Sequence, residues 1–155
     1  MTEKDAIKFL RTPRKLMVVG ASNKPHRAGH YVPKFLQQLG FELIPVNPNE
    51  TEIWGIPALA SMDDYSGKVD SIIFYRNVKS AKQLALKAIE DRKTDFIWFP
   101  DLVTSNTVAE KAKLANIGFI QNRCPLRDYH DLVDGKEDKL LEFDLPTTEL
   151  FSSSK

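Results

Sequence analysis

Short apolar runs that alternate with segments of helical periodicity constrain the fold of this chain more than any other feature. The runs are too short for typical helices, which indicates buried strands, whereas the segments between them carry apolar residues on one helix face. Strands are expected at residues 16–19, 43–46, 69–75, 96–99 and, more briefly, from 119, and helices at 6–10, 31–39, 81–89 and 108–115. This alternation is typical of a parallel sheet covered on both faces. We therefore predict a Rossmann-like α/β fold of three layers, with a mostly parallel five-stranded sheet and helices on both faces.

The length and composition fit one such domain. The chain has 155 residues, of which 42% are hydrophobic and 28% charged, an ordinary globular balance. Residues 53–64 are expected to form a connector with a short turn of helix. We expect the domain to occupy residues 1–130. Residues 131–155 are expected to form an acidic, flexible tail, because they show no clear periodicity and hold seven acidic but three basic residues.

Charge and cysteine content narrow the class of partner and the compartment. The net charge is +1, which gives no global indication of nucleic-acid or membrane binding. No apolar stretch is long enough to span a bilayer, and the first residues lack the pattern of a secretory signal. The lone Cys124 has no partner for an internal disulfide. We therefore expect a cytoplasmic protein in a reducing environment.

The segment directly after the first expected strand combines a glycine turn with positive charge. Gly20 lets the backbone turn sharply, and the helix that follows offers free N–H groups to an anion. Lys24 and Arg27 add positive charge where a phosphate would lie. Because ligands of parallel α/β sheets bind beyond the carboxyl ends of the strands, this segment predicts a phosphate-bearing nucleotide ligand. A plain strand-to-helix turn with solvated basic side chains is the structural alternative.

The type of nucleotide is narrowed by what the turn lacks. A dinucleotide fingerprint reads G-x-G-x-x-G with an acidic residue about 20 or more positions further on. Ser22 and Pro25 stand at the second and third glycine positions, and the second expected strand ends at Asn47, which is not an acid. NAD is therefore disfavoured. The chain also contains no Gly-Lys-Ser/Thr phosphate-binding motif, which argues against a P-loop NTPase.

Two motifs resemble a known family. They are Val-Val-Gly-Ala-Ser at residues 18–22, with the Lys-Pro-x-Arg that follows at 24–27, and Ile-Pro-Val-Asn-Pro at 44–48. In both, the chain resembles the small CoA-binding proteins, whose Rossmann-type domain is similar to the CoA-binding domain of the succinyl-CoA synthetase alpha subunit. Gly-Ile-Pro-Ala at 55–58, Ser-Met at 61–62 and Asn-Arg-Cys-Pro at 122–125 continue the resemblance, which covers about residues 10–130.

The resemblance implies a site for coenzyme A or an acyl-CoA, and it implies which residues form that site. The phosphates would lie at Gly20, Ala21, Ser22 and Arg27, with Lys24 adding charge, while Asn47, Pro48, Tyr75 and Arg76 would flank the nucleotide and the loop of Phe99 would lie near the pantetheine path. One departure concerns that loop. Relatives usually carry Gln or Glu and a Gly after the fourth strand, where this chain reads Pro-Asp-Leu at 100–102. The second, histidine-bearing domain of the synthetase does not fit in this length, so ligase chemistry is not expected.

Other candidate residues have simpler interpretations. Cys124 is predicted to be a small buried residue rather than a functional thiol, although the resemblance places it near the thiol of CoA, where a mixed disulfide is conceivable. His26 either assists phosphate binding or is a solvated loop residue, and Asp101 is interpreted as a solvated loop acid. Trp98 is expected in the core. No metal site and no catalytic residue are predicted.

These observations lead to one main hypothesis and two alternatives. The main hypothesis is a non-catalytic module, of binding or regulatory type, that holds coenzyme A or an acyl-CoA through the glycine turn. The first alternative is a small NAD(P)-linked enzyme that uses the same turn, against which the missing acid after the second strand argues. The second is a scaffold whose tail binds a partner and whose pocket is vestigial. A small-molecule nucleotide is the expected partner, and the sequence leaves any protein partner open.

Overall fold

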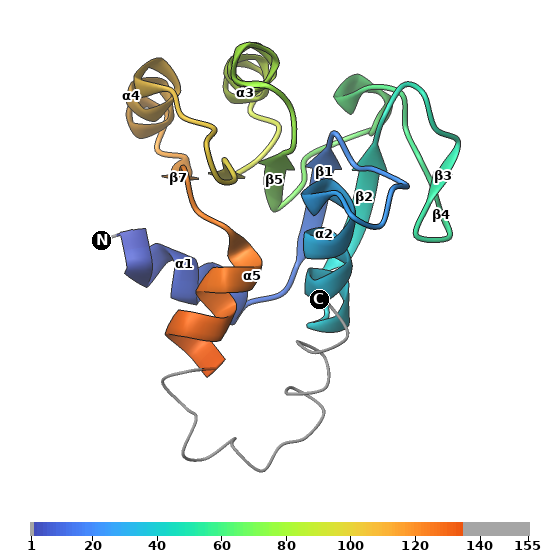
Figure 1. Ribbon diagram of the computed structural model, residues 1–155. Coiled ribbons are helices and arrows are strands. Elements are labelled where there is room, and N and C mark those ends of the chain that lie inside the picture. The colour runs from blue at the N-terminus through green and yellow to red at the C-terminus, as the bar shows by residue number, and fades with distance from the viewer. Residues whose placement is uncertain (1, 135–155) are drawn as a thin grey trace.

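The structure is a computed structural model that describes residues 2–134 (Figure 1). The strands are β1 (Lys15–Val19), β2 (Glu42–Val46), β3 (Glu52–Ile53), β4 (Ile56–Pro57), β5 (Ser71–Phe74), β6 (Phe96–Trp98) and β7 (Gly118–Ile120). The α-helices are α1 (Thr2–Leu10), α2 (Ala28–Gln38), α3 (Val78–Glu90), α4 (Asn106–Leu114) and α5 (Pro125–Asp128), with further helical turns η1 (Met62–Asp64) and η2 (Tyr129–Asp134).

The main sheet has five strands in the order β2-β1-β5-β6-β7, and all neighbouring pairs are parallel. The chain runs from β1 outward to β2 and then returns to the other side of β1 as β5. The strand order therefore reverses between β1 and β5, where Met17 pairs with Ile44 on one side and with Ile72 on the other. This reversal creates a crevice at the carboxyl ends of β1 and β5.

Helices cover both faces of this sheet, as the alternation of the sequence predicts. Side chains of successive strand residues point to opposite faces, so Ile97 packs with α3 and α4 whereas Trp98 packs with α1 and α2. Figure 1 shows α3 and α4 together on one side and α1, α2 and α5 on the other. The predicted fold class is confirmed: a three-layer, Rossmann-like α/β fold with a parallel five-stranded sheet.

Two elements differ from the sequence-based expectation. The connector at 53–64 contains the expected helical turn η1, but it begins with a small antiparallel hairpin, β3–β4, that periodicity could not indicate because each strand has two residues. The helix expected at 31–39 begins three residues earlier, at Ala28. Pro33 therefore lies inside α2 rather than in its first turn.

The C-terminal side of the described chain is helical beyond the expected domain boundary at residue 130. Helix α5 continues into η2, which ends at Asp134, and Leu132 and Val133 are buried with Ala6 and Leu10 of α1. The remainder of the expected tail, residues 135–155, lies outside the described residues. Among residues 2–134, no helix has both the length and the apolar character needed to cross a membrane.

Candidate functional site

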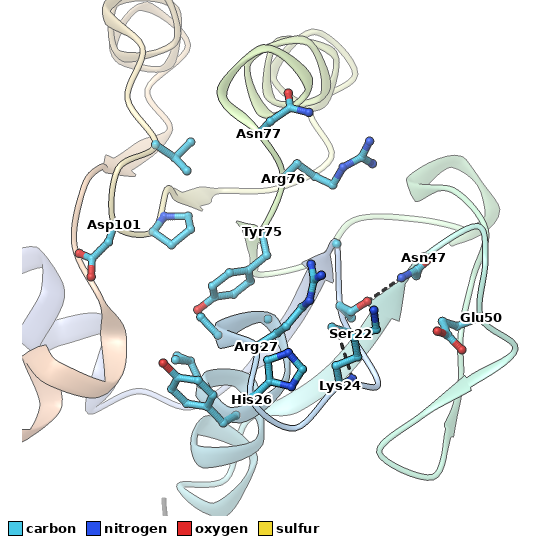
Figure 2. A pocket seen from close by; sticks show the side chains of 18 of the residues that line it. Ser22, Lys24, His26, Arg27, Asn47, Glu50, Tyr75, Arg76, Asn77 and Asp101 are labelled. Carbon is cyan, nitrogen blue, oxygen red and sulfur yellow. Dashed lines mark hydrogen bonds between the residues drawn. The ribbon is translucent and has the colours of Figure 1, made fainter. Parts of the chain in front are cut away.

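A cleft of about 1030 Å³ lies at the switch in strand order, beyond the carboxyl ends of the strands (Figure 2). Loops that follow β1, β2, β5 and β6 form its walls, and Cys124 closes one side. The volume is at the upper end of the range for small-molecule and cofactor sites. The fold therefore places one large concave site where parallel α/β proteins bind their ligands.

The turn after β1 is fixed by a close backbone approach. Gly20 has a φ of +87°, and a Cβ at this position would lie 2.1 Å from the carbonyl oxygen of Tyr75. The N–H of Gly20 also donates to the carbonyl of Val46, at 3.0 Å. Only glycine allows β1, β2 and β5 to meet this closely, so the turn is set by the sheet itself.

A second glycine completes the turn from the helix side. A Cβ on Gly29 would lie 2.9 Å from the carbonyl oxygen of Gly20 and 3.2 Å from Cβ of Tyr75. Pro33 has no N–H to donate to the carbonyl of Gly29, four residues before it, and that carbonyl accepts instead from the N–H of Ser22, at 3.3 Å. Gly29 thus supplies the close helix–strand packing that the dinucleotide fingerprint assigns to its third glycine. The fingerprint spacing counted from Gly20 falls on position 25, so the sequence alone did not indicate this role for Gly29.

Three cationic side chains line the cleft: Lys24 and Arg27 on the turn that leads into α2, and Arg76 on the loop after β5. Arg27 is the N-cap residue of α2, and its side chain makes no capping hydrogen bond. The N–H of His30 donates to the carbonyl of Arg27, at 2.9 Å, so the N–H groups of Ala28 and Gly29 are the ones that remain available among the described residues. Lys24, Arg27 and Arg76 all line the cleft and are exposed. Within residues 2–134, none of the three forms a salt bridge or a side-chain hydrogen bond. The arrangement is suited to phosphate oxygens, which combine negative charge with several acceptor positions.

The loop after β2 is tied to the glycine turn by amide side chains. Nδ2 of Asn47 donates to the carbonyl of Ala21, and Oδ1 of Asn47 accepts from the N–H of Asn49, both at 2.8 Å. Nδ2 of Asn23 donates to Oε1 of Glu50 at 2.8 Å. An acidic residue therefore does line this part of the cleft, four positions past the strand end where sequence analysis looked for it.

The middle and the far side of the cleft hold side chains that are uncharged or already ion-paired. The hydroxyl of Tyr75 is buried and has no hydrogen-bond partner among the described residues, and burial raises its pKa well above the ordinary tyrosine value. Burial also raises the pKa of the half-buried Cys124 thiol. Both carboxylate oxygens of Asp101 accept from the guanidinium of Arg127, at 2.7 and 2.9 Å, and these hydrogen bonds lower the pKa of Asp101.

Comparison with known proteins agrees with this geometry. A family model described as CoA binding domain matches residues 14–130. The chain belongs to this CoA-binding domain family. The match spans the sheet, all four loops of the cleft and Cys124. It also confirms the resemblance that residues 18–27 and 44–48 carry, to the small CoA-binding proteins whose domain is similar to that of the succinyl-CoA synthetase alpha subunit.

The relatives differ in how much of their own length matches this chain. The YneT protein of Bacillus subtilis (strain 168) is 33% identical over 82 residues, which are 53% of this chain and 61% of that one. The ADP-forming acetate–CoA ligase II subunit alpha of Pyrococcus furiosus is 35% identical over 83 residues, 53% of this chain but 18% of the subunit. The chain thus spans less than two thirds of these curated relatives. A hypothetical protein from Pyrococcus horikoshii OT3 has a similar structure, with a TM-score of 0.77, 28% identity, and coverage of 86% of this chain and 93% of that one.

The residues predicted from sequence gather at the cleft of the CoA-binding domain, with one exception. Gly20, Ala21, Ser22, Lys24, Arg27, Asn47, Pro48, Tyr75 and Arg76 all line it. Phe99 does not: its side chain is fully buried, with edge contacts to the rings of Phe74 and Phe119. The strand alternation turns Phe99 into the core, and the loop that follows it supplies Pro100 and Asp101 to the cleft instead. Trp98 is fully buried, as expected.

Several lining residues lay outside the predicted set. His26, Gly29, Tyr31, Asn49, Glu50, Asn77, Val103 and Cys124 are the main additions, together with Pro100 and Asp101. Most follow the carboxyl ends of the strands, so strand ends were the signal that could have found them. Within residues 2–134, no group of three or more His, Cys, Asp or Glu side chains is arranged to hold a metal ion.

Proposed function

We propose that this CoA-binding domain holds coenzyme A or an acyl-CoA in the cleft, with the phosphates at the glycine turn. The observation that carries the proposal is that three cations line the cleft, Lys24, Arg27 and Arg76, and that none of them has an ion-pair partner within residues 2–134. Lys24 and Arg27 come from the turn that leads into the open start of α2. Charged side chains that line a cleft without protein partners keep their full capacity for an anionic ligand. A pyrophosphate at this place would accept hydrogen bonds from the free N–H groups at the start of α2 and would neutralise the charge of these cations.

We further propose that the module is non-catalytic, of binding or regulatory type. The lining groups that could act as nucleophile or acid–base catalyst are poorly prepared for it. Burial raises the pKa of the Cys124 thiol, which disfavours the nucleophilic thiolate, and the carboxylate of Asp101 is held by Arg127. His26 is exposed and forms no hydrogen bond with a cleft residue. Ligase activity is not proposed, because the aligned region covers 18% of the acetate–CoA ligase subunit.

The setting proposed for this function is cytoplasmic. A thiol that lines a ligand cleft, as Cys124 does, stays available as a thiol in a reducing compartment. The ligand we propose is a small-molecule nucleotide, and neither a nucleic acid nor a membrane is part of the proposal.

A two-step experiment tests this function. The absorbance of the freshly purified protein near 260 nm, followed by mass analysis of anything released on denaturation, identifies a co-purified nucleotide. The ligand-free protein is then melted with CoA, acetyl-CoA or NAD. A ligand that binds the folded state stabilises it by mass action, about 2.7 kcal/mol at a concentration 100 times Kd. We expect CoA or acetyl-CoA to raise the Tm, and NAD to raise it much less. Equal or larger shifts with NAD would favour the NAD(P)-linked alternative over the CoA proposal.

A further inference from the structure

The rim of the cleft contributed by the segment after β2 is acidic. From Asn47 to Gly67 the chain contains no lysine or arginine, whereas the same stretch contains four acidic residues, of which Glu50 and Glu52 are nearest to β2. Glu50 lines the cleft and is half-buried, while Glu52 is exposed and lies outside the lining. The rim after β2 is thus opposite in charge to the glycine turn, where Lys24 and Arg27 lie.

The Glu50 carboxylate is held in place but keeps one oxygen free. Oε1 accepts from Nδ2 of Asn23, at 2.8 Å, and the same amide donates to the backbone carbonyl of Glu52, also at 2.8 Å. The backbone of Glu50 is fixed by a turn in which its N–H donates to the carbonyl of Asn47, at 3.3 Å. Among residues 2–134, Oε2 accepts no hydrogen bond and the carboxylate forms no salt bridge.

A fixed carboxylate at this place in the fold has a specific chemical use. In doubly wound sheets, an acid beyond the second strand accepts hydrogen bonds from ribose hydroxyls of a nucleotide whose phosphates lie at the first turn. Glu50 and the glycine turn have this relative placement, as the positions of Glu50 and Ser22 in Figure 2 show. Asn23 links the two loops through its hydrogen bond to Glu50. The negative charge of Glu50 would repel a phosphate group on the ribose. The segment at 47–67, which carries Glu50, contains no lysine or arginine that would offset this repulsion.

We propose that Glu50 is a specificity-determining residue that contacts the ribose and favours a free 2′,3′-diol over a ribose that carries a phosphate. The inference rests on the proposed function, since it assumes a nucleotide of the CoA type in the cleft. In this proposal, the pyrophosphate of the ligand lies at the glycine turn and its ribose lies at Glu50. Dephospho-CoA, whose ribose diol is free, therefore fits the Glu50 side of the cleft better than CoA, whose ribose carries a 3′-phosphate.

The test compares Glu50→Gln with the matched control Glu52→Gln. Glutamine keeps an oxygen that can accept from Asn23, so the two loops stay linked while one negative charge is removed. Glu52→Gln removes the same charge from a neighbouring position outside the cleft. Affinities of both variants and the wild type for CoA and dephospho-CoA are measured by calorimetry at low and high salt.

The expected result has opposite signs for the two ligands. Glu50→Gln should weaken dephospho-CoA by about three- to tenfold, through loss of a charge-assisted hydrogen bond to the ribose. It should strengthen CoA by about three- to tenfold, through loss of repulsion, and salt should reduce this gain. Glu52→Gln should leave both affinities within about twofold, because the Glu52 side chain is exposed and outside the cleft, where its charge is screened by solvent and salt.

Two outcomes would overturn the proposal. In one, Glu50→Gln changes both affinities in the same direction and by the same factor. In the other, Glu52→Gln reproduces the effect of Glu50→Gln. If the wild type binds neither form of CoA, the proposed function fails, and the comparison is made with ADP and its 3′-phosphorylated derivative. The ribose preference then stands or falls on the same opposite signs.

Discussion

The two walls of the cleft use charge in opposite ways. The near wall comprises the turn from β1 to α2, residues 20–29. The far wall comprises the loop at 100–103 and Cys124, and we count with it the segment at 123–128, of which Cys124 alone lines the cleft. On the near wall, Lys24 and Arg27 have no ion-pair partner among the described residues. On the far wall, Arg127 pairs with Asp101 and Arg123 pairs with Asp128, each through two hydrogen bonds.

This difference separates charge used for the fold from charge available to a ligand. A guanidinium that already binds a carboxylate bidentately has used the geometry that a phosphate would need. The far-wall arginines therefore stabilise the chain, whereas the near-wall cations retain their donors. The near wall obtains its own rigidity from backbone contact at two glycines instead. Substitutions on the far wall should therefore change stability more than CoA affinity, and substitutions of the near-wall cations should do the reverse.

The largest expected effect is on the backbone of the near wall. Gly20→Ala should destabilise the fold by more than about 4 kcal/mol, because it combines a positive φ with a Cβ 2.1 Å from a backbone oxygen. Urea unfolding followed by circular dichroism measures the loss. Gly55→Ala is the control: Gly55 also has a positive φ, of +75°, but no atom lies within 4 Å of the added Cβ, so about 1–2 kcal/mol is expected. Equal losses would show that the close approach at Gly20 relaxes easily.

The next effect concerns the buried ion pair of the far wall. Asp128 is 4% exposed, and its carboxylate binds Arg123 at 2.8 and 3.0 Å. Asp128→Asn should cost about 2–3 kcal/mol of unfolding free energy, since it leaves a guanidinium without its charged acceptor. Asp101→Asn breaks the more exposed pair with Arg127 and should cost less than about 1 kcal/mol. CoA affinity should fall little in Asp128→Asn, and a large fall would contradict a purely structural role for the pair.

The near-wall cations should show the reverse pattern. Arg27→Ala should weaken CoA binding by roughly 1–3 kcal/mol, the range expected for a charge-assisted hydrogen bond to phosphate. The Tm of the ligand-free protein should barely change, because Arg27 is exposed and makes no capping bond. Calorimetry with CoA and dephospho-CoA locates the contact. Equal weakening of both places Arg27 at the pyrophosphate, whereas weakening of CoA alone places it at the 3′-phosphate. Unchanged affinity for both would remove Arg27 from the site.

The two walls also differ in how far the sequence predicts them. Every strand of the main sheet and the glycine turn could be predicted, because apolar periodicity and the position of Gly20 are local signals. Gly29 and Glu50 could not, since their roles depend on which backbone segments approach each other in three dimensions. The loop of Phe99 lines the cleft through Pro100 and Asp101, whereas the Phe99 side chain itself is buried in the core, a distinction that depends on the strand alternation at the end of β6. The pairing of Arg127 with Asp101 spans 26 residues, and no local pattern indicates it.

The smallest expected effect tests a residue between the walls. The hydroxyl of Tyr75 is buried without a partner among the described residues, so Tyr75→Phe should leave stability unchanged or raise it by up to about 1 kcal/mol, as the desolvation cost of an unpaired group disappears. The raised pKa gives a second measurement. Folding favours the neutral phenol, so the wild type loses stability as the pH rises above about 10, the pKa of the unfolded tyrosine, and the variant should lose less. Tyr65→Phe is the control, since the Tyr65 hydroxyl accepts from Nζ of Lys15 outside the cleft. A Tyr75→Phe protein that is less stable by more than about 1 kcal/mol would mean that an ordered water satisfies the hydroxyl, and that the space between the walls is filled before any ligand arrives.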